Sequence, residues 1–148
     1  TNIPRRYASQ VARQGLESLD TLAGSVKAWI APLPIEYDPD LPGYKNMLTM
    51  MAGHGGPNLP KAQAIKDATM AHFIQTHMKA GTAFIHYNGS YHSENHEGII
   101  WYLKRKKPNL RYATITTLHQ KDIHTLSKEN KNKAHFIICI DENMTPTY

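Results

Sequence analysis

The residues best suited to chemistry lie in one short segment near the middle of the chain, residues 86–97. Its ionisable side chains are three histidines, two tyrosines and two glutamates: His86, His92, His96, Tyr87, Tyr91, Glu94 and Glu97. An imidazole exchanges its proton near neutral pH and is also a common metal ligand. An apolar strand pattern precedes the segment, and an amphipathic helical pattern follows it. Because ligands of open α/β sheets bind at such strand-to-helix turns, the segment predicts a functional site.

His92 is the candidate in this segment for acid–base chemistry or metal ligation. Gly89, three residues before it, could adopt a positive φ angle, which would let His92 project from a tight turn. Asp67 borders the apolar stripe of a predicted helix, where a carboxylate needs a partner. That partner could be a backbone amide or an arginine, or Asp67 could orient a catalytic histidine. Glu97 is an alternative residue for orienting His92.

A second candidate site lies on a short helix predicted over residues 44–52. Tyr44, Met47, Met51 and His54 are spaced three, four and three residues apart, which gathers a phenol, thioethers and an imidazole on one helical face. Such a face suits a flat apolar cofactor, and haem iron accepts His, Met or Tyr as an axial ligand. Ordinary packing of these side chains is the alternative.

Basic residues outnumber acidic ones by 17 to 12, which gives a net charge of +5. The lysines and arginine of residues 104–107 close a predicted helix, where the dipole favours cations, and other lysines are scattered through loops. We therefore expect a solvated basic surface and no nucleic-acid partner. Arg5 and Arg6 differ, because the first turn of a helix disfavours cations. We therefore expect Arg5 and Arg6 either to bind an anion, such as the propionates of haem, or to be exposed to solvent.

The order of the predicted elements indicates one α/β domain, for which 148 residues suffice. Helices are predicted over residues 4–19, 44–52, 60–79 and 96–107, a short extended piece over 26–33, and strands over 82–85, 110–116 and 136–140. This order implies parallel pairing. With only three strands, the expected fold is a partial, mostly parallel sheet flanked by helices, with residues 34–60 as a loop and short-helix insertion. We expect this chain to pack against the missing amino-terminal half of the domain. Another expected partner is a second copy of the chain, in a homo-oligomer.

Three separated motifs resemble the carboxyl-terminal half of ChaN-like proteins, from Asn2 to about Ile115. They cover residues 2–8, 62–71 and 86–92. ChaN-like proteins are described as iron-regulated, haem-binding bacterial lipoproteins, in a superfamily with Tiki, TraB and the erythromycin esterases. That superfamily is defined by Gly-x-x-His motifs with acidic and arginine residues. Gly89-Ser90-Tyr91-His92 matches one such motif, and the other one would precede Thr1.

The resemblance implies haem binding for uptake or storage in an extracytoplasmic, membrane-anchored lipoprotein. The residues around iron would then come from two groups: Tyr44, Met51 and His54 on one, Tyr87, Tyr91 and His92 on the other. The arginines Arg5 and Arg6 would lie near the propionates. Possible direct ligands of a metal are His54, Tyr44 and His92.

The resemblance also implies an alternative function, a hydrolase of the Tiki or erythromycin esterase type, with or without a metal ion. His92 would act as general base or metal ligand, and Asp67 or Glu97 would orient it. We expect the separate polar clusters, including Arg5, Asp67 and His92, to converge in one hollow at the rim of the sheet.

Overall fold

The computed structural model describes residues 2–50 and 56–145. Its regular elements are α1 (Arg5–Gln14), α2 (Gly24–Lys27), α3 (Pro42–Met50), α4 (Leu59–His77), α5 (Ile99–Lys106), β1 (Ile115–Gln120) and β2 (Phe136–Asp141). Short 3-10 turns cover Leu16–Leu19, Ser90–His92, Glu94–His96 and Lys128–Asn130. The mixed α/β class predicted from the sequence is confirmed. None of the helices in these ranges is long and apolar enough to cross a membrane.

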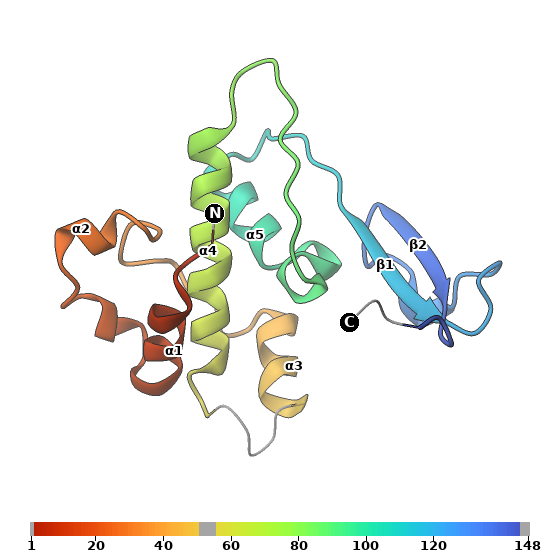
Figure 1. Ribbon diagram of the computed structural model, residues 1–148, viewed down its shortest axis with the longest axis horizontal. Helices are drawn as coiled ribbons and strands as arrows, with labels where there is room; N and C mark the ends of the chain where they lie inside the picture. Colours follow the sequence, from red (N-terminus) through yellow and green to blue (C-terminus); the bar gives the residue numbers. More distant parts are fainter. Residues whose placement is uncertain (1, 51–55, 146–148) are drawn as a thin grey trace.

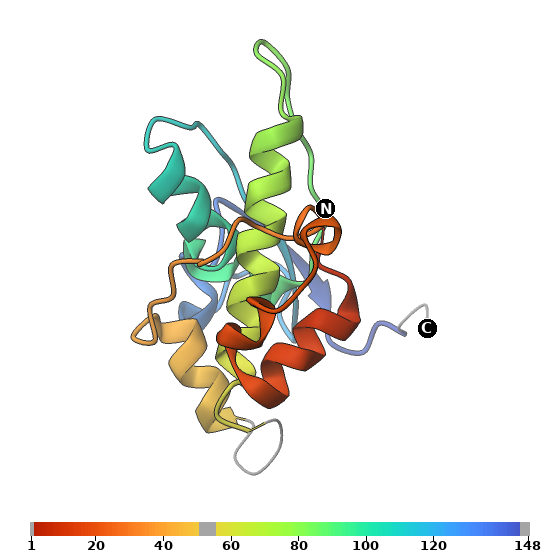
Figure 2. The same ribbon diagram turned by 90° about the vertical axis from the view of Figure 1, so that its left-hand side faces the viewer.

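Helix α4 is the centre of the molecule, with α1 and α2 on one side and α3 and α5 on the other (Figures 1 and 2). Pro60 in its first turn suits a helix start, because the missing N–H would have had no partner there. Ala64, Ile65 and Ala71 are almost completely buried. The helix buries side chains around most of its circumference because α1 packs on one flank and α5 on another.

Two apolar clusters hold these helices together. One joins Tyr7 and Val11 of α1 to Ile65 of α4, and the other joins Ile74 of α4 to Leu103 of α5. Each fully buried aliphatic side chain contributes on the order of 2 kcal/mol to folding. The core therefore fixes α4 firmly, and any residue of α4 that faces α3 is held in place with it.

The first predicted helix is interrupted in the structure. Gly15 has a φ of +87° and ends α1, and its N–H donates to the carbonyl of Val11 at 2.8 Å. The chain then forms the separate 3-10 turn Leu16–Leu19. The expected extended piece at 26–33 is also wrong, because Val26 lies in the short helix α2 and packs against the α1 cluster.

The predicted strand at 82–85 does not form. Phe84 packs against the α4–α5 cluster while Ile85 is largely exposed, and within residues 56–145 no strand pairs with this segment. A strand needs a partner for its backbone groups, which the local sequence pattern does not reveal. The strand predicted at 110–116 begins only at Ile115, because Leu110 and Tyr112 pack against the helices instead. The prediction for β2 is confirmed.

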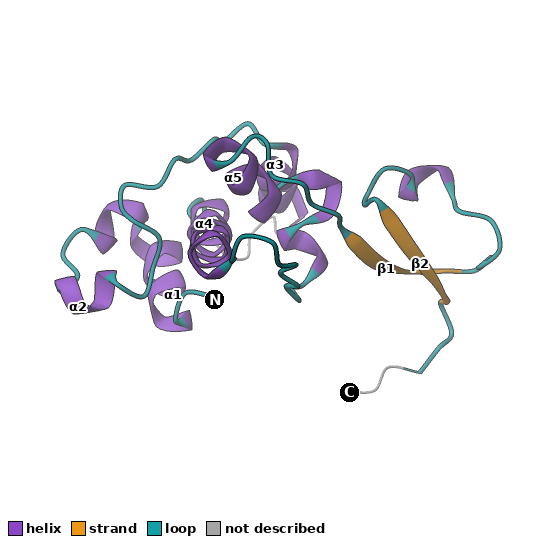
Figure 3. Ribbon diagram, turned by 90° about the horizontal axis from the view of Figure 1, so that it is seen from above, coloured by secondary structure: helices purple, strands orange, loops and turns teal. Residues whose placement is uncertain are grey.

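The strands β1 and β2 pair in parallel, in a register that runs from Ile115 opposite Phe136 to Gln120 opposite Asp141. They stand beyond the helices, as the view from above shows (Figure 3). Ile115, Phe136 and Ile138 are more than half exposed. Parallel sheets are ordinarily covered on both faces, so this pair has the character of a partial α/β domain.

Candidate functional site

The centre of the candidate site is a contact between Asp67 of α4 and His92 of the 3-10 turn Ser90–His92. Oδ1 of Asp67 lies 2.5 Å from Nδ1 of His92. The Asp67 side chain is fully buried, whereas that of His92 keeps 17% of its surface exposed. Nε2 of Gln63, one turn earlier on α4, lies 2.8 Å from Nδ1 of His92 and 3.5 Å from Oδ1 of Asp67. When Nδ1 gives its proton to Asp67, the Gln63 amide can donate to the carboxylate but not to that ring nitrogen. The carboxylate therefore holds the imidazole at the edge of the core.

Tyr44 of α3 completes the surroundings of this carboxylate. Its hydroxyl donates to Oδ2 of Asp67 at 3.1 Å, and the ring is buried. Burial, followed by the nearby charge of Asp67, raises the pKa of Tyr44 far above that of a free phenol. The hydroxyl thus keeps its proton and is committed to Asp67. A role for Tyr44 as an ionised iron ligand would require this hydrogen bond to break.

Burial also raises the pKa of Asp67 above its ordinary value of 3.8, and the hydrogen bonds from His92 and Tyr44 oppose that shift. Desolvation is the larger effect, because the carboxyl group is enclosed by α3, α4 and the 90–92 turn. Burial lowers the pKa of the neighbouring Lys66, against the opposite pull of Asp67. Burial is therefore the largest influence on the pKa values of both Asp67 and Lys66.

A glycine brings the two halves of the site together. Gly98 has a φ of +54° and a ψ of −119°, a backbone conformation that other residues rarely adopt. A Cβ atom at Gly98 would lie 2.5 Å from the carbonyl oxygen of His92 and 3.2 Å from Oδ2 of Asp67. The expectation of a positive φ at Gly89 is wrong, since its φ is −67°. The helix predicted over 96–107 included Gly98, whereas α5 begins only at Ile99, directly after this glycine.

Glu97 lies in the structure beside α3 rather than beside His92. Its Oε2 accepts a hydrogen bond from the backbone N–H of Gly43 at 2.7 Å. Gly43 is in the first turn of α3, where N–H groups lack helical partners and the dipole attracts an anion. Glu97 thus holds the start of α3. The same helix carries Tyr44, whose hydroxyl donates to Asp67.

The 85–92 segment carries exposed apolar side chains, and Met50 of α3 lies beside it. The hydroxyl of Tyr91 donates to Sδ of Met50 at 3.3 Å, which ties the segment to the end of α3. Met50, Tyr91 and Ile85 are more than half exposed, and Tyr87 is 91% exposed. Met51 and His54, which the sequence placed near the iron, lie outside the described residues.

The two candidate arginines lie elsewhere. Arg5 and Arg6 are exposed on α1, and the Arg6 guanidinium lies 4.7 Å from the ring centre of Tyr7 and 5.9 Å from that of Trp29. Helices α1 and α3 lie on different flanks of α4 (Figure 2). The structure therefore brings Asp67, His92 and Tyr44 together. The expected convergence of Arg5 with Asp67 and His92 is wrong, because both arginines are exposed on α1 and Arg6 lies in a separate aromatic cluster.

The residues of the described ranges contain no group of three or more His, Cys, Asp or Glu side chains that could hold a metal ion. A sequence model of the family described as "Haem-binding uptake, Tiki superfamily, ChaN" matches residues 1–103, which include Tyr44, Asp67, His92 and Gly98. No curated protein and no solved structure matches the chain. Because the match covers more than two thirds of the sequence, the chain belongs to the ChaN family of the Tiki superfamily.

Proposed function

We propose that this protein binds haem for uptake or storage, and that His92 would hold the iron. The observation that carries the proposal is the 2.5 Å contact between Nδ1 of His92 and Oδ1 of Asp67. When Nδ1 donates its proton to a carboxylate, Nε2 is left as the ring nitrogen with a lone pair. Ligating histidines commonly have this arrangement, because the carboxylate fixes the tautomer and makes the imidazole a stronger donor.

The segment that ends at His92 exposes side chains that suit the apolar face of haem. Tyr87, Tyr91, Met50 and Ile85 offer exposed aromatic and aliphatic surface on the same segment and on the end of α3. Such surface would exclude water from a flat macrocycle. Haem supplies the iron, and the protein needs only to hold and release it. Arg5 and Arg6 belong to the other flank of α4, so this proposal assigns the propionates no arginine partner.

Titration of haem into the full-length protein, followed in the Soret region, tests the proposal. We expect a saturable band at micromolar haem in the wild type and its loss in His92→Ala. His86→Ala is the matched control, because His86 is an exposed histidine of the same segment and contacts Asn88 rather than Asp67. Absence of a band in the wild type would refute haem binding. An unchanged band in His92→Ala would refute the assigned ligand.

The same pair of residues supports a second candidate function, a hydrolase. A carboxylate that orients an imidazole through Nδ1 also prepares Nε2 to take a proton from an attacking water molecule. His92 would be the general base and Asp67 its positioning residue. Ester and peptide libraries, assayed with wild type and His92→Ala, test this function. A rate that is measurable in the wild type and unchanged in the variant would eliminate His92 from the chemistry.

An uptake role further suggests export and a lipid anchor, as the family resemblance implies. Fractionation of the source cells tests this part of the proposal. We expect the full-length protein in the membrane fraction, released by detergent. Recovery in the cytoplasmic fraction would contradict it.

A further inference from the structure

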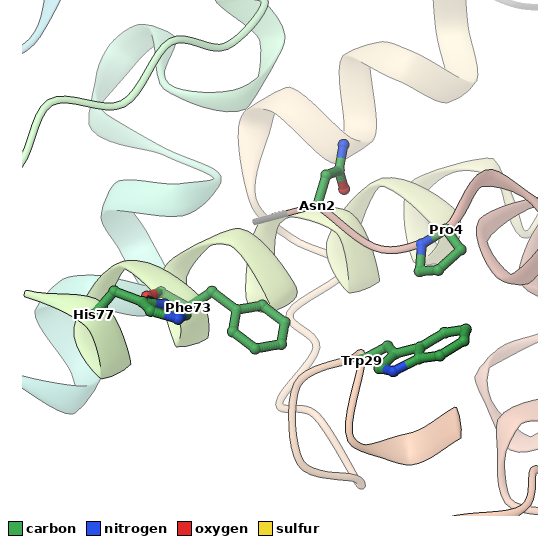
Figure 4. Close-up of a pocket in the computed structure, with 5 residues that line it drawn as sticks. All are labelled: Asn2, Pro4, Trp29, Phe73 and His77. Carbon is green, nitrogen blue, oxygen red and sulfur yellow. Dashed lines mark hydrogen bonds between the residues drawn. The ribbon is translucent and has the colours of Figure 1, made fainter. Parts of the chain in front are cut away.

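An open pocket lies between the beginning of the chain and the carboxyl-terminal half of α4. Its volume is about 340 Å³, and it is lined by Asn2, Pro4, Trp29, Phe73 and His77 (Figure 4). Ligand pockets typically begin at about this size. We propose that this cavity is a second binding site, independent of His92, for a flat aromatic carboxylate.

The walls of the cavity are aromatic. Trp29 is 50% exposed, so its ring is accessible from this pocket. The Phe73 ring extends from α4 toward Trp29 and Pro4 (Figure 4). Phe73 also lies 5.8 Å from His77, measured between ring centres. Flat rings that border an open cavity bind another flat ring by stacking and by burial of apolar area.

His77 contributes an acceptor at one end of this wall. Its Nδ1 lies 2.7 Å from the backbone oxygen of Phe73. A carbonyl oxygen can only accept, so Nδ1 carries the proton of this hydrogen bond. In the neutral ring, Nε2 is then the acceptor. Nε2 could therefore accept a hydrogen bond from an N–H or O–H group on a bound ring, but it could not bind a carboxylate.

Arg6 supplies positive charge beside the pocket, next to Trp29, although it is not one of the five lining residues. None of the five lining residues is acidic. The Arg6 guanidinium lies 5.9 Å from the ring centre of Trp29, and Arg5 is its neighbour in the first turn of α1. A guanidinium binds a carboxylate through two parallel hydrogen bonds. A bound carboxylate would also account for two cations in a helical turn that the dipole makes unfavourable for them.

The chemical class is thus an aromatic ring system with at least one carboxylate. Small aromatic acids and carboxylated porphyrins share this chemistry, and the experiment separates them. The indole N–H signal of Trp29 in a ¹⁵N–¹H spectrum reports directly on the cavity. The chain has two tryptophans, so comparison with Trp101→Phe assigns the signal.

The probes are 2-naphthoate and its uncharged analogue 2-naphthylmethanol, added to the full-length protein. We expect 2-naphthoate to shift the Trp29 signal in a saturable way and to bind about fivefold more tightly than the alcohol. Arg6→Ala should weaken 2-naphthoate binding to about the level of the alcohol and leave the alcohol unaffected. Arg13→Ala, which removes an exposed arginine near the other end of α1, is the matched control and should change neither.

Phe73→Leu keeps an apolar side chain in the wall and should weaken both probes, with thermal unfolding as the check that the variant is folded. If protoporphyrin IX shifts the same signal and displaces 2-naphthoate, the ligand is a tetrapyrrole; if only the small acid binds, it is a smaller aromatic acid. A Trp29 signal that neither 2-naphthoate nor protoporphyrin IX moves would overturn the proposal. Equal binding of acid and alcohol, unaffected by Arg6→Ala, would overturn it as well.

Discussion

Asp67 and His92 lie 25 residues apart in the chain, yet Oδ1 of one is 2.5 Å from Nδ1 of the other. The contact links the rigid central helix α4 to the turn that carries the Gly-x-x-His motif. Asp67 is fully buried and His92 is not, so the pair connects the core to the surface. The orientation of His92 therefore depends on a residue that solvent never reaches.

Replacement of Asp67 by Asn should weaken haem binding by about 10- to 100-fold, because His92 loses the carboxylate that fixes its tautomer. Asp20→Asn, at an exposed position away from the site, should have no effect. Soret titrations of both variants measure the change. Equal affinity in Asp67→Asn and wild type would show that the carboxylate does not assist the ligand.

The same substitution should alter how stability depends on pH. Burial raises the pKa of Asp67 above 3.8, so the folded protein holds this proton more tightly than the unfolded chain does. Its contribution to stability is present below about pH 4 and is lost as pH rises through the folded pKa. We expect the unfolding free energy of wild type, relative to Asp67→Asn, to fall between about pH 3.5 and pH 7. Urea denaturation at both pH values would contradict this if the difference stayed constant or grew.

Gly98→Ala should destabilise the protein by about 2 to 4 kcal/mol, because a Cβ at this backbone conformation would collide with the His92 carbonyl. Gly81→Ala is the informative control, since Gly81 also has a positive φ of +75° but has open space around it. Its cost should be about 1 kcal/mol, from the backbone alone. Urea denaturation compares the two, and equal losses would mean that the close approach at His92 contributes nothing.

Glu97→Ala should reduce the unfolding free energy by about 1 kcal/mol, because the Gly43 N–H at the start of α3 loses its acceptor. Glu142→Ala removes an exposed glutamate and should cost much less. In the hydrolase reading, Glu97 would instead orient His92. A large loss of activity in Glu97→Ala without loss of stability would favour that role and contradict the anchoring of α3.

Of the features that depend on local pattern, two helices were predicted well, whereas the break at Gly15 and the short helix α2 were missed. The helices expected at 44–52 and 60–79 are observed at Pro42–Met50 and Leu59–His77, as far as the structure describes them. Non-local features were not predictable in this way. The 82–85 segment has strand-like residues but no partner to pair with, and Glu97 finds Gly43 at a separation of 54 residues. Arg6 packs on Trp29, which no spacing in the sequence suggested.

Resonance Raman spectroscopy of the ferrous haem complex tests the central claim most directly, because the iron–histidine stretch reports both the ligand and the hydrogen bond at its other nitrogen. The stretch should be present in the wild type, shift to lower frequency in Asp67→Asn, and disappear in His92→Ala. A stretch that persists in His92→Ala, or that has the same frequency in Asp67→Asn as in the wild type, would contradict the role assigned to the Asp67–His92 pair.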